Sequence, residues 1–558
     1  MKQYEDVTSE RSPGIVEPPC ASVDLRDLSW PARFVRDYCH AHEPLDQFFV
    51  HAPSGSDVWP RAIDARRERP ARSGTADIVV AQLAARQAPA LAQSHAERLR
   101  DPATVCVVTG QQAALFGGPL YTLLKALTTI KLARRISEKH EAPVVPIFWV
   151  DADDHDLAEI STASVLDADS ALRHVSVPQP ATEGLPASGW RLTDAVTDAV
   201  SALRSALPET EFSEPLLDRL SAIYRPETGI VTAFCQWLDE VLGPHGLVVF
   251  DASDPAAKSL TADLFERELE RPGETARVAG AAGIRLTALG YHAQVTPAEH
   301  GVALFSLDGG RYPIRYDPAD TVAFTINGTR VARDELLTRV RSKPETFSPN
   351  VLLRPIVQDA LFPSIAYVAG PSELAYLGQL LDVYDAFDVP MPVVYPRATA
   401  TFVDRATEKF LDRQDLVFAD LQAQDDHVLD RLASSLLPAS VEDALTTTDH
   451  LVRERLATIR HEVAAVDSTL AGAVDTTTTR MTRDLGTLRG KVVQAAKRRD
   501  ETLRRQFQHA RAIAFPDGAP QERAVGFLYL LNRSGPHVVE RLLAELPLGI
   551  GQHWLLPI

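Results

Sequence analysis

An acidic cluster around one histidine is the part of the sequence best suited to chemistry. Asp151, Asp153, Asp154 and Asp156 crowd carboxylates around His155. Like charges this close cost stability unless a cation, a protonated neighbour or solvent relieves them. His155 titrates near neutral pH and could act as a base, with Asp154 or Asp156 orienting its ring. Such loops also cap helices, so a catalytic role and a capping role are both open. Mg²⁺ carried by ATP would need only one or two of these carboxylates, and we predict no dedicated metal site.

A glycine-bearing turn, Gly110 to Pro119, holds a second group of candidate ligands. The side-chain amides of Gln111 and Gln112 can orient a carboxylate, hydroxyl or phosphate, or can bond the turn's own backbone. A helix start after glycines offers free N–H groups to an anion. Neither the Walker spacing nor Gly-x-Gly-x-x-Gly is present, so the glycines leave phosphate binding and a purely structural turn equally open.

Two basic residues among apolar neighbours also have alternative roles. Lys125, in the helix after this turn, could reach a phosphate or extend to solvent, and we favour the second. Arg354 could pair with Asp359 or Glu373 in the core, or could hold a substrate carboxylate with both arms of its guanidinium group.

The elements around these residues predict a βαβ unit. Thr104–Val108 and Val144–Val150 have the composition of buried parallel strands, and the apolar residues from Leu120 to Ile130 recur at helical spacing between them. A right-handed crossover places the carboxyl ends of both strands at one edge of the sheet. The Gly-Gln-Gln turn and the acidic loop should therefore face the same crevice.

The rest of residues 1–399 predicts a continuation of this core, with insertions at about 160–245 and 294–349. Strand patterns return at 246–251, 366–369 and 393–397. After the second of these, Gly370-Pro371-Ser372-Glu373 predicts another helix start able to bind an anion.

From residue 400 the pattern becomes almost wholly helical. Val452, Leu456, Ile459 and Val463 follow heptad spacing, but glycines occur at 472, 486 and 490. An intermolecular coiled coil and an intramolecular helical hairpin are both open for residues 400–515. We expect 516–558 to be a helical tail that packs on the core.

Composition narrows the class of protein. With 558 residues and 45% hydrophobic content, the chain should form two or three domains. It shows neither an apolar run of membrane-spanning length nor a signal peptide, and its four cysteines are widely spaced, so we expect a cytoplasmic protein. The net charge of −18 argues against a nucleic-acid partner.

Several ordered motifs resemble those of one family, the bacillithiol biosynthesis cysteine-adding enzymes, BshC. They are Val108-Thr109-Gly110-Gln111-Gln112-Ala113, Gly118-Pro119-Leu120-Tyr121-Thr122 with Lys125, Phe148-Trp149, Asp154-His155-Asp156 with Glu159, Phe347–Val351, Arg354-Pro355, Gly370–Tyr376 and Glu522–Asn532. The resemblance implies a Rossmann-like α/β core similar to nucleotidyltransferases, two connective-peptide insertions, and a C-terminal helical coiled-coil domain that forms a homodimer. It implies a ligase that joins cysteine to glucosaminyl-malate, the last step to bacillithiol.

Joining a carboxylate to an amine is uphill in water, so we expect carboxyl activation by ATP, with or without Mg²⁺. We assign catalysis to His155, Asp154 and Asp156. Substrate binding is assigned to Thr109, Gly110, Gln111, Gln112, Gly118, Tyr121 and Arg354. Nucleotide binding is assigned to Gly370, Pro371, Ser372, Glu373, Tyr376 and Lys125. The alternatives are a non-catalytic dimeric scaffold that binds a nucleotide or metabolite, and a nucleotidyltransferase acting on another small acid.

Overall fold

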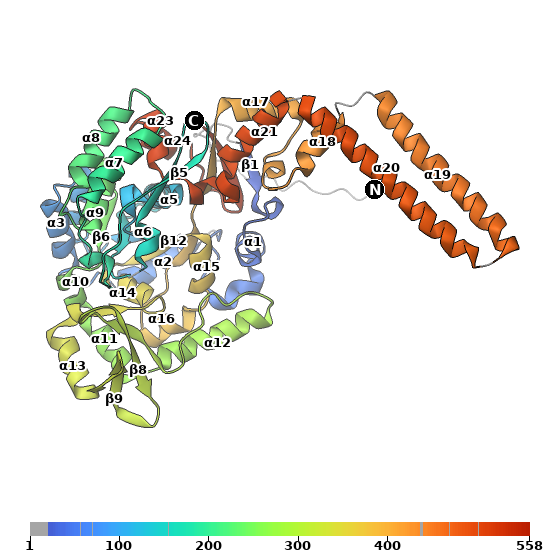
Figure 1. Ribbon diagram of the computed structural model, residues 1–558. Helices are drawn as coiled ribbons and strands as arrows, with labels where there is room; N and C mark the ends of the chain where they lie inside the picture. Colours follow the sequence, from blue (N-terminus) through green and yellow to red (C-terminus); the bar gives the residue numbers. More distant parts are fainter. Residues whose placement is uncertain are drawn as a thin grey trace. The chain divides into compact units, whose positions relative to one another are not determined.

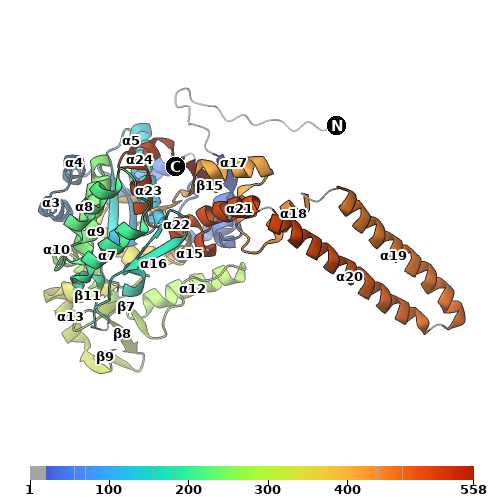
Figure 2. The ribbon, with the colours of Figure 1, turned by 45° about the horizontal axis from the view of Figure 1, so that its top comes forward.

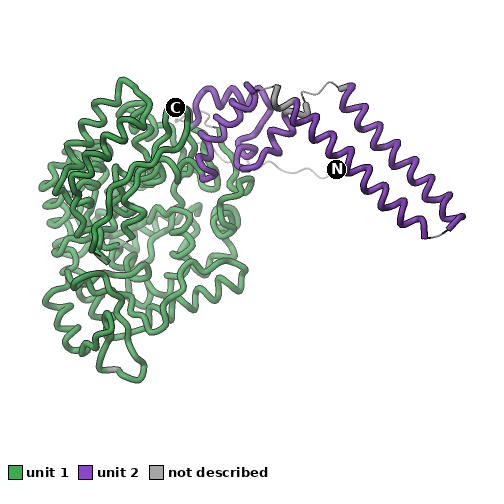
Figure 3. Tube along the Cα trace, in the orientation of Figure 1, with its two compact units in different colours: residues 1–402, 520–556, 558 green, residues 403–519, 557 purple. Residues whose placement is uncertain are grey.

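The chain divides into two compact units. The computed structural model describes residues 21–558 apart from 56, 70, 155, 183, 436–438, 468 and 500. Unit 1 contains the residues up to 402 together with 520–556 and 558, and unit 2 contains 403–519 and 557 (Figure 3). Each unit is described by itself below.

A five-stranded parallel sheet organises unit 1. Its strand order is β13-β12-β2-β3-β6. The strands are β2 (Val105–Gln112), β3 (Val144–Asp151), β6 (Val248–Asp251), β12 (Ser364–Ala369) and β13 (Val393–Pro396). Helix α5 (Leu120–His140) crosses from β2 to β3. The predicted Rossmann-like core is thereby confirmed.

Strand β2 is longer than predicted. Gly110, Gln111 and Gln112 continue the strand and pair with Trp149, Val150 and Asp151 of β3, so the turn begins only after Gln112. A Cβ atom at residue 110 would lie 2.9 Å from the carbonyl oxygen of Trp149, which explains the glycine inside a paired strand. The two glutamines are therefore held by the sheet and do not belong to a flexible loop.

Both faces of the sheet are buried. Val105 and Val107 pack with Ile63 of α2 (Val58–Arg67) and with Ile136 of α5. Cys106 and Val108 point to the opposite face and join a larger cluster, which includes α1 (Arg33–His40), α3 (Thr75–Ala85), α4 (Ala90–Arg98) and α16 (Leu381–Phe387). Burial on both sides accounts for the unbroken apolar runs in these strands.

The segments between the core strands carry smaller motifs (Figure 1). Between β3 and β6 lie α6 (Leu157–Ile160), the hairpin β4 (Thr162–Leu166) and β5 (Leu172–Ser176), α7 (Ala195–Ala206), α8 (Ser213–Ile223) and α9 (Ile230–Leu242). After β6 come α10 (Pro255–Leu260), α11 (Ala262–Glu270) and α12 (Glu274–Ala288). An antiparallel sheet follows, in the order β10-β9-β8-β7-β11. Its elements are β7 (Gly301–Ser306), β8 (Tyr312–Asp317), β9 (Asp320–Ile326), β10 (Thr329–Ala332) and β11 (Phe347–Pro349), with α13 (Arg333–Ser342) between the last two.

The remaining elements of unit 1 close the core. Helices α14 (Arg354–Leu361) and α15 (Pro371–Leu377) flank β12 in sequence, and α22 (Gln521–Ala524), α23 (Leu528–Ser534) and α24 (Val538–Glu545) form the tail. A small sheet in the order β1-β15-β14 joins β1 (Ala21–Asp24), β15 (Gln552–Pro557) and β14 (Thr399–Val403).

Unit 2 is helical and contains a long hairpin. Its helices are α17 (Arg405–Gln414), α18 (His427–Ser435), α19 (Ala439–Val466), α20 (Leu470–Arg499) and α21 (Glu501–Ala514). Helices α19 and α20 lie side by side in both ribbon views, and Arg460 bonds Asp475 across them at 2.8 Å (Figures 1 and 2). The coiled-coil domain is thereby confirmed, and the helices pair within one chain. None of the helices in the described part of the chain is long and apolar enough to cross a membrane.

Candidate active site

One large cavity lies at the carboxyl ends of β2, β3 and β12, within unit 1. Its volume is about 660 Å³. Parallel α/β sheets bind their ligands at this edge. The charged side chains in its lining are Asp151, Asp154, Glu159, Glu373, Lys125, Arg311, Arg354, Arg397 and Arg523. Both signs of charge therefore border the cavity.

Most of the predicted site residues line this cavity. They are Gly110, Gln111, Gln112, Tyr121, Lys125, Asp154, Arg354, Gly370, Pro371, Ser372, Glu373 and Tyr376. The segments that contain them meet because β2 pairs with β3 on one side and with β12 on the other. The expectation that the Gly-Gln-Gln segment and the acidic loop face one crevice thus agrees with the geometry.

Thr109 and Gly118 lie outside the cavity lining. The hydroxyl of Thr109 is buried in the sheet and donates to Val368 O at 2.8 Å. Gly118 has φ +76°, and its carbonyl accepts a hydrogen bond from Phe527 N at 3.1 Å. The structure therefore gives no support to substrate binding by these two residues, because backbone packing occupies both.

The first N–H group of α5 has its partner in the tail and not in the cavity. The N–H of Leu120 donates to Val525 O at 2.7 Å, and Pro119 forms a bridge with Gly526. The tail thus supplies the acceptor that we expected an anion to supply. This N–H group is therefore not available to an anion, and the anion site predicted at this helix start stays a prediction.

Lys125 is buried, so the expectation that it extends to solvent is wrong. It is 3% exposed. Its ammonium donates to Gly110 O at 2.7 Å and to Gln111 Oε1 at 3.0 Å, and it forms an ion pair with Glu373 at 2.5 Å. An ammonium group has three hydrogens, and these partners occupy all of them. Lys125 therefore connects the end of β2 to the start of α15.

Glu373 completes this network. Its carboxylate accepts hydrogen bonds from Gly370 N at 2.7 Å and from Tyr367 OH at 2.6 Å. Burial alone would raise the pKa of Glu373, but Lys125 and the hydrogen bonds from Tyr367 and Gly370 together outweigh burial, and the pKa is lowered. Since Gly370, Glu373 and Lys125 satisfy one another, their contacts give no support to the nucleotide-binding roles predicted for them.

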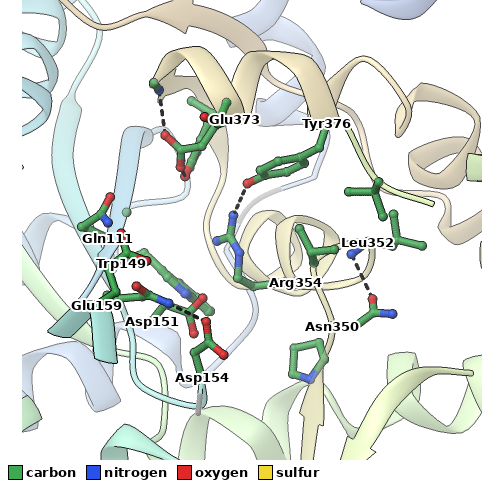
Figure 4. A pocket seen from close by; sticks show the side chains of 18 of the residues that line it. Gln111, Trp149, Asp151, Asp154, Glu159, Asn350, Leu352, Arg354, Glu373 and Tyr376 are labelled. Atoms are coloured by element: carbon green, nitrogen blue, oxygen red, sulfur yellow. Dashed lines mark hydrogen bonds between the residues drawn. The ribbon is translucent and has the colours of Figure 1, made fainter. Parts of the chain in front are cut away.

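Arg354 lies on the wall of the cavity that faces Trp149 and Asp151 (Figure 4). Its guanidinium donates to Tyr376 OH at 3.0 Å and to Gln358 Oε1 at 3.1 Å, and it lies 5.9 Å from the centre of the Tyr367 ring. These partners differ from the acidic ones we considered. Asp359 instead accepts from Tyr384 OH at 2.5 Å on the far side of the helix. Arg354 thus uses two neutral partners, and its charge remains available to a ligand.

Asp154 is held from two sides in the acidic loop. Gln112 Nε2 donates to one of its oxygens, and Arg311 Nη1 lies 3.1 Å from the other. Asp156 is exposed at the start of α6 and does not line the cavity, while His155 lies outside the described residues. The catalytic roles of His155 and Asp156 therefore remain predictions. Among the described residues there is no cluster of three or more potential ligands for a metal ion.

Tyr121 lies beside this loop and reaches the cavity from α5. Gln111 Nε2 donates to its phenolic oxygen at 3.3 Å. Burial and the nearby Glu159 raise the pKa of Tyr121 to about 12, so the phenol stays protonated at neutral pH. Burial also raises the pKa of Glu159, and Asp156 and Asp154 add to that effect.

Three arginines in the lining escaped the sequence analysis. Arg311 follows β7, Arg397 follows β13 and Arg523 belongs to α22 of the tail. Arg397 is 5% exposed and forms a two-pronged pair with Glu522. These residues show no local spacing that could have revealed them. Only the family-like stretch from Glu522 to Asn532 pointed to the tail.

Two family models and several known proteins match most of the chain. The family model for the BshC N-terminal Rossmann-like domain matches residues 20–398, and the model for the BshC C-terminal coiled-coil domain matches residues 400–558. A protein of Salinibacter ruber named "Putative cysteine ligase BshC" is 35% identical over 523 residues, covering 92% of this chain and 94% of its own length. Proteins with the same name in Chlorobaculum tepidum and Geobacillus kaustophilus are 33% and 30% identical. They cover 81% and 95% of this chain, and 82% and 99% of their own lengths.

Proposed function

The chain belongs to the BshC family of bacillithiol biosynthesis, and from this membership we propose that it is a cysteine ligase. The proposed reaction joins the carboxyl group of cysteine to the amine of glucosaminyl-malate and so forms the amide bond of bacillithiol, a small thiol.

The main support for this proposal is that the regions matched by the BshC family models contain the whole lining of the cavity. The two family models together span every residue of the lining, from Gly110 to Arg523. The volume of about 660 Å³ lies in the usual range for small-molecule sites, ~300–1,000 Å³. Glucosaminyl-malate carries two carboxylates and an amine, which suit a lining that contains both arginines and carboxylates.

We propose ATP as the co-substrate that activates the carboxyl group. An amide does not form from a carboxylate and an amine in water without a leaving group, and ATP would supply one. Among the described residues, Arg354 has only neutral hydrogen-bond partners, and the side chain of Arg523 shows no ion pair. These two guanidinium groups can donate hydrogen bonds to a phosphate. The ammonium of Lys125 cannot, because its donors are already used.

The direct test is reconstitution with the purified full-length protein. Incubation with cysteine, glucosaminyl-malate and ATP should yield bacillithiol by mass spectrometry, and omission of ATP should abolish the product. Cleavage of ATP that depends on cysteine, without amide formation, would instead support a nucleotidyltransferase. Binding without either reaction would support a scaffold. In a deletion strain, the ligase proposal predicts loss of bacillithiol and accumulation of glucosaminyl-malate.

A further inference from the structure

Asp151 differs from three other acidic residues around the cavity and its inner extension, Glu373, Asp154 and Asp153. The described residues provide Lys125 as partner for Glu373, Gln112 and Arg311 for Asp154, and Lys258 for Asp153. No hydrogen bond or ion pair of the Asp151 carboxylate is seen within that part of the chain. Its carboxylate is therefore available to a molecule in the cavity.

Asp151 also lies where two cavities meet. It is the last residue of β3, and it lines both the main cavity and a smaller inner cavity of about 20 Å³. The two cavities share Trp149, Asp151, Pro349 and Arg354. Figure 4 shows Asp151 beside Trp149, on the wall that faces Arg354. A volume of this size holds about one water molecule, so the inner cavity can hold a small polar group next to the carboxylate.

A buried ion pair fixes the backbone behind Asp151. Lys258 Nζ lies 2.8 Å from Asp153 Oδ2 and donates to Phe347 O at 3.0 Å. Lys258 is 5% exposed and Asp153 is 7% exposed. The pair ties the loop that follows β3 to the start of β11, whose last residue, Pro349, lines the cavity together with Asn350. Asp151 thus projects from a strand whose end is held on both sides.

The charges around Asp151 favour a base. Burial raises the pKa of Asp151, Arg354 opposes this effect, and Asp154 and Asp153 add to it. The charged and titratable groups that face it are Asp153 and Asp154 from its own loop, Arg354 from α14, Arg311 from the segment after β7, and Tyr376 from α15. A carboxylate with a raised pKa takes a proton from an amine more readily than an ordinary aspartate does.

We propose that Asp151 is the catalytic base that deprotonates the attacking amine in the amide-forming step. This inference rests on the proposed ligase function. The nitrogen lone pair forms the new C–N bond to the activated carboxyl carbon, and the bond from that carbon to the phosphate oxygen breaks. The phosphate-bearing group leaves with the bonding electrons. The proton lost by nitrogen moves to the Asp151 carboxylate, which later releases it to solvent.

The test compares Asp151→Asn with a matched control, Asp169→Asn, which lies in the exposed turn between β4 and β5. Asp151→Asn should lower single-turnover amide formation by ~10²-fold or more, because a general base contributes this much. Cysteine-dependent ATP cleavage should stay near the wild-type rate, since it does not involve the amine. The control should retain both rates. Wild-type protein that forms no amide would overturn the proposed function itself.

Two further measurements separate a base from a structural residue. Asp151→Ala should regain part of its amide-forming rate when formate is added, because formate can accept the proton in place of the missing carboxylate. In wild type the rate should rise with pH as Asp151 loses its proton, and Asp151→Asn should lack this rise. The inference is overturned if Asp151→Asn forms amide at the wild-type rate, or if formate leaves Asp151→Ala unchanged. It is also overturned if only His155→Ala shows the selective loss.

Discussion

Arg397 and Glu522 form a fully buried ion pair that links the end of the core sheet to the tail. Their side chains are 2% and 1% exposed, and two N–H groups of Arg397 meet the two oxygens of Glu522 at 2.7 and 2.9 Å. The neighbouring Arg523 lines the cavity. The pair thus fixes the segment of the tail that contributes to the active site.

Replacing Glu522 by Gln should be strongly destabilising. The change leaves the guanidinium of Arg397 buried without its counter-charge, which costs roughly 3–5 kcal/mol of unfolding free energy. Thermal or urea unfolding measures this loss. The exposed Glu211→Gln is the matched control and should unfold like wild type. A Glu522→Gln protein as stable as wild type would contradict the importance of the pair.

The pH dependence of this pair has a definite sign. Burial alone would raise the pKa of Glu522, but Arg397, with smaller contributions from His553 and the N–H of Ala400, outweighs burial, and the pKa is lowered. A carboxylate with a depressed pKa stabilises the fold above its unfolded value of about 4.5. That contribution is lost as the pH falls below this value and through the folded pKa. The stability difference between wild type and Glu522→Gln should therefore shrink in acid.

A double-mutant cycle on Lys125 and Glu373 distinguishes a structural lysine from a phosphate ligand. Lys125→Met leaves the half-buried Glu373 without its counter-charge, and it should cost at most roughly 3–5 kcal/mol of stability. The double variant Lys125→Met, Glu373→Gln should recover much of this loss, because neither partner is then charged. Equal stability of Lys125→Met and wild type, combined with weaker ATP binding, would restore the nucleotide-binding role.

Replacing Glu268 should give a variant that is more stable than wild type at alkaline pH. Glu268 is 1% exposed and accepts hydrogen bonds from Ala303 N at 2.7 Å and from the Thr275 hydroxyl. Burial raises its pKa from 4.5 to about 7. The Glu268 carboxyl group therefore contributes stability below pH 4.5 that is lost as the pH rises through about 7, because the folded protein must then bury a charge.

Glu268→Gln imitates the protonated carboxyl group. It should match wild type near pH 4.5 and exceed it at pH 8 by up to roughly 3 kcal/mol, as a shift of this size implies. Urea unfolding at both pH values measures the difference. The exposed Glu270→Gln on the same helix should show no such trend. A pH-independent effect of Glu268→Gln would show that Glu268 is ionised throughout this range.

The hairpin of unit 2 is predicted to associate with a second copy. Its side chains Leu451, Ile459, Val466, Leu470, Met481 and Leu488 are between 40% and 82% exposed, although they are large and apolar. Ile459→Asp with Leu488→Asp should convert a dimer into a monomer in sedimentation experiments, whereas Thr458→Asp should not. Leu456 is half-buried within the hairpin, so Leu456→Asp should also disturb its fold. A monomeric wild type would exclude the dimer.

The sequence predicted those parts of the site that local patterns encode. The βαβ unit followed from apolar spacing, and its right-handed crossover placed Gln112 and Asp154 at one edge of the sheet. Lys125 was misplaced because its burial depends on Glu373, which follows a different strand. Arg311 and Arg523 were missed for the same reason, since only tertiary packing brings them to β3. The heptads could not separate a hairpin from an intermolecular coiled coil, because both require the same apolar spacing.

The small sheet that joins the two ends of the described chain has a consequence for biosynthesis on the ribosome. Strand β15 lies between β1 and β14, and α22 supplies Glu522 and Arg523 to the core. Residues 403–519 are translated before any of this tail exists. After the strands of the parallel sheet have left the ribosome, the cavity therefore stays incomplete, and Arg397 stays unpaired, until residues 520–558 have also left the exit tunnel. Premature termination after the hairpin should yield proteins that are degraded and have no residual activity.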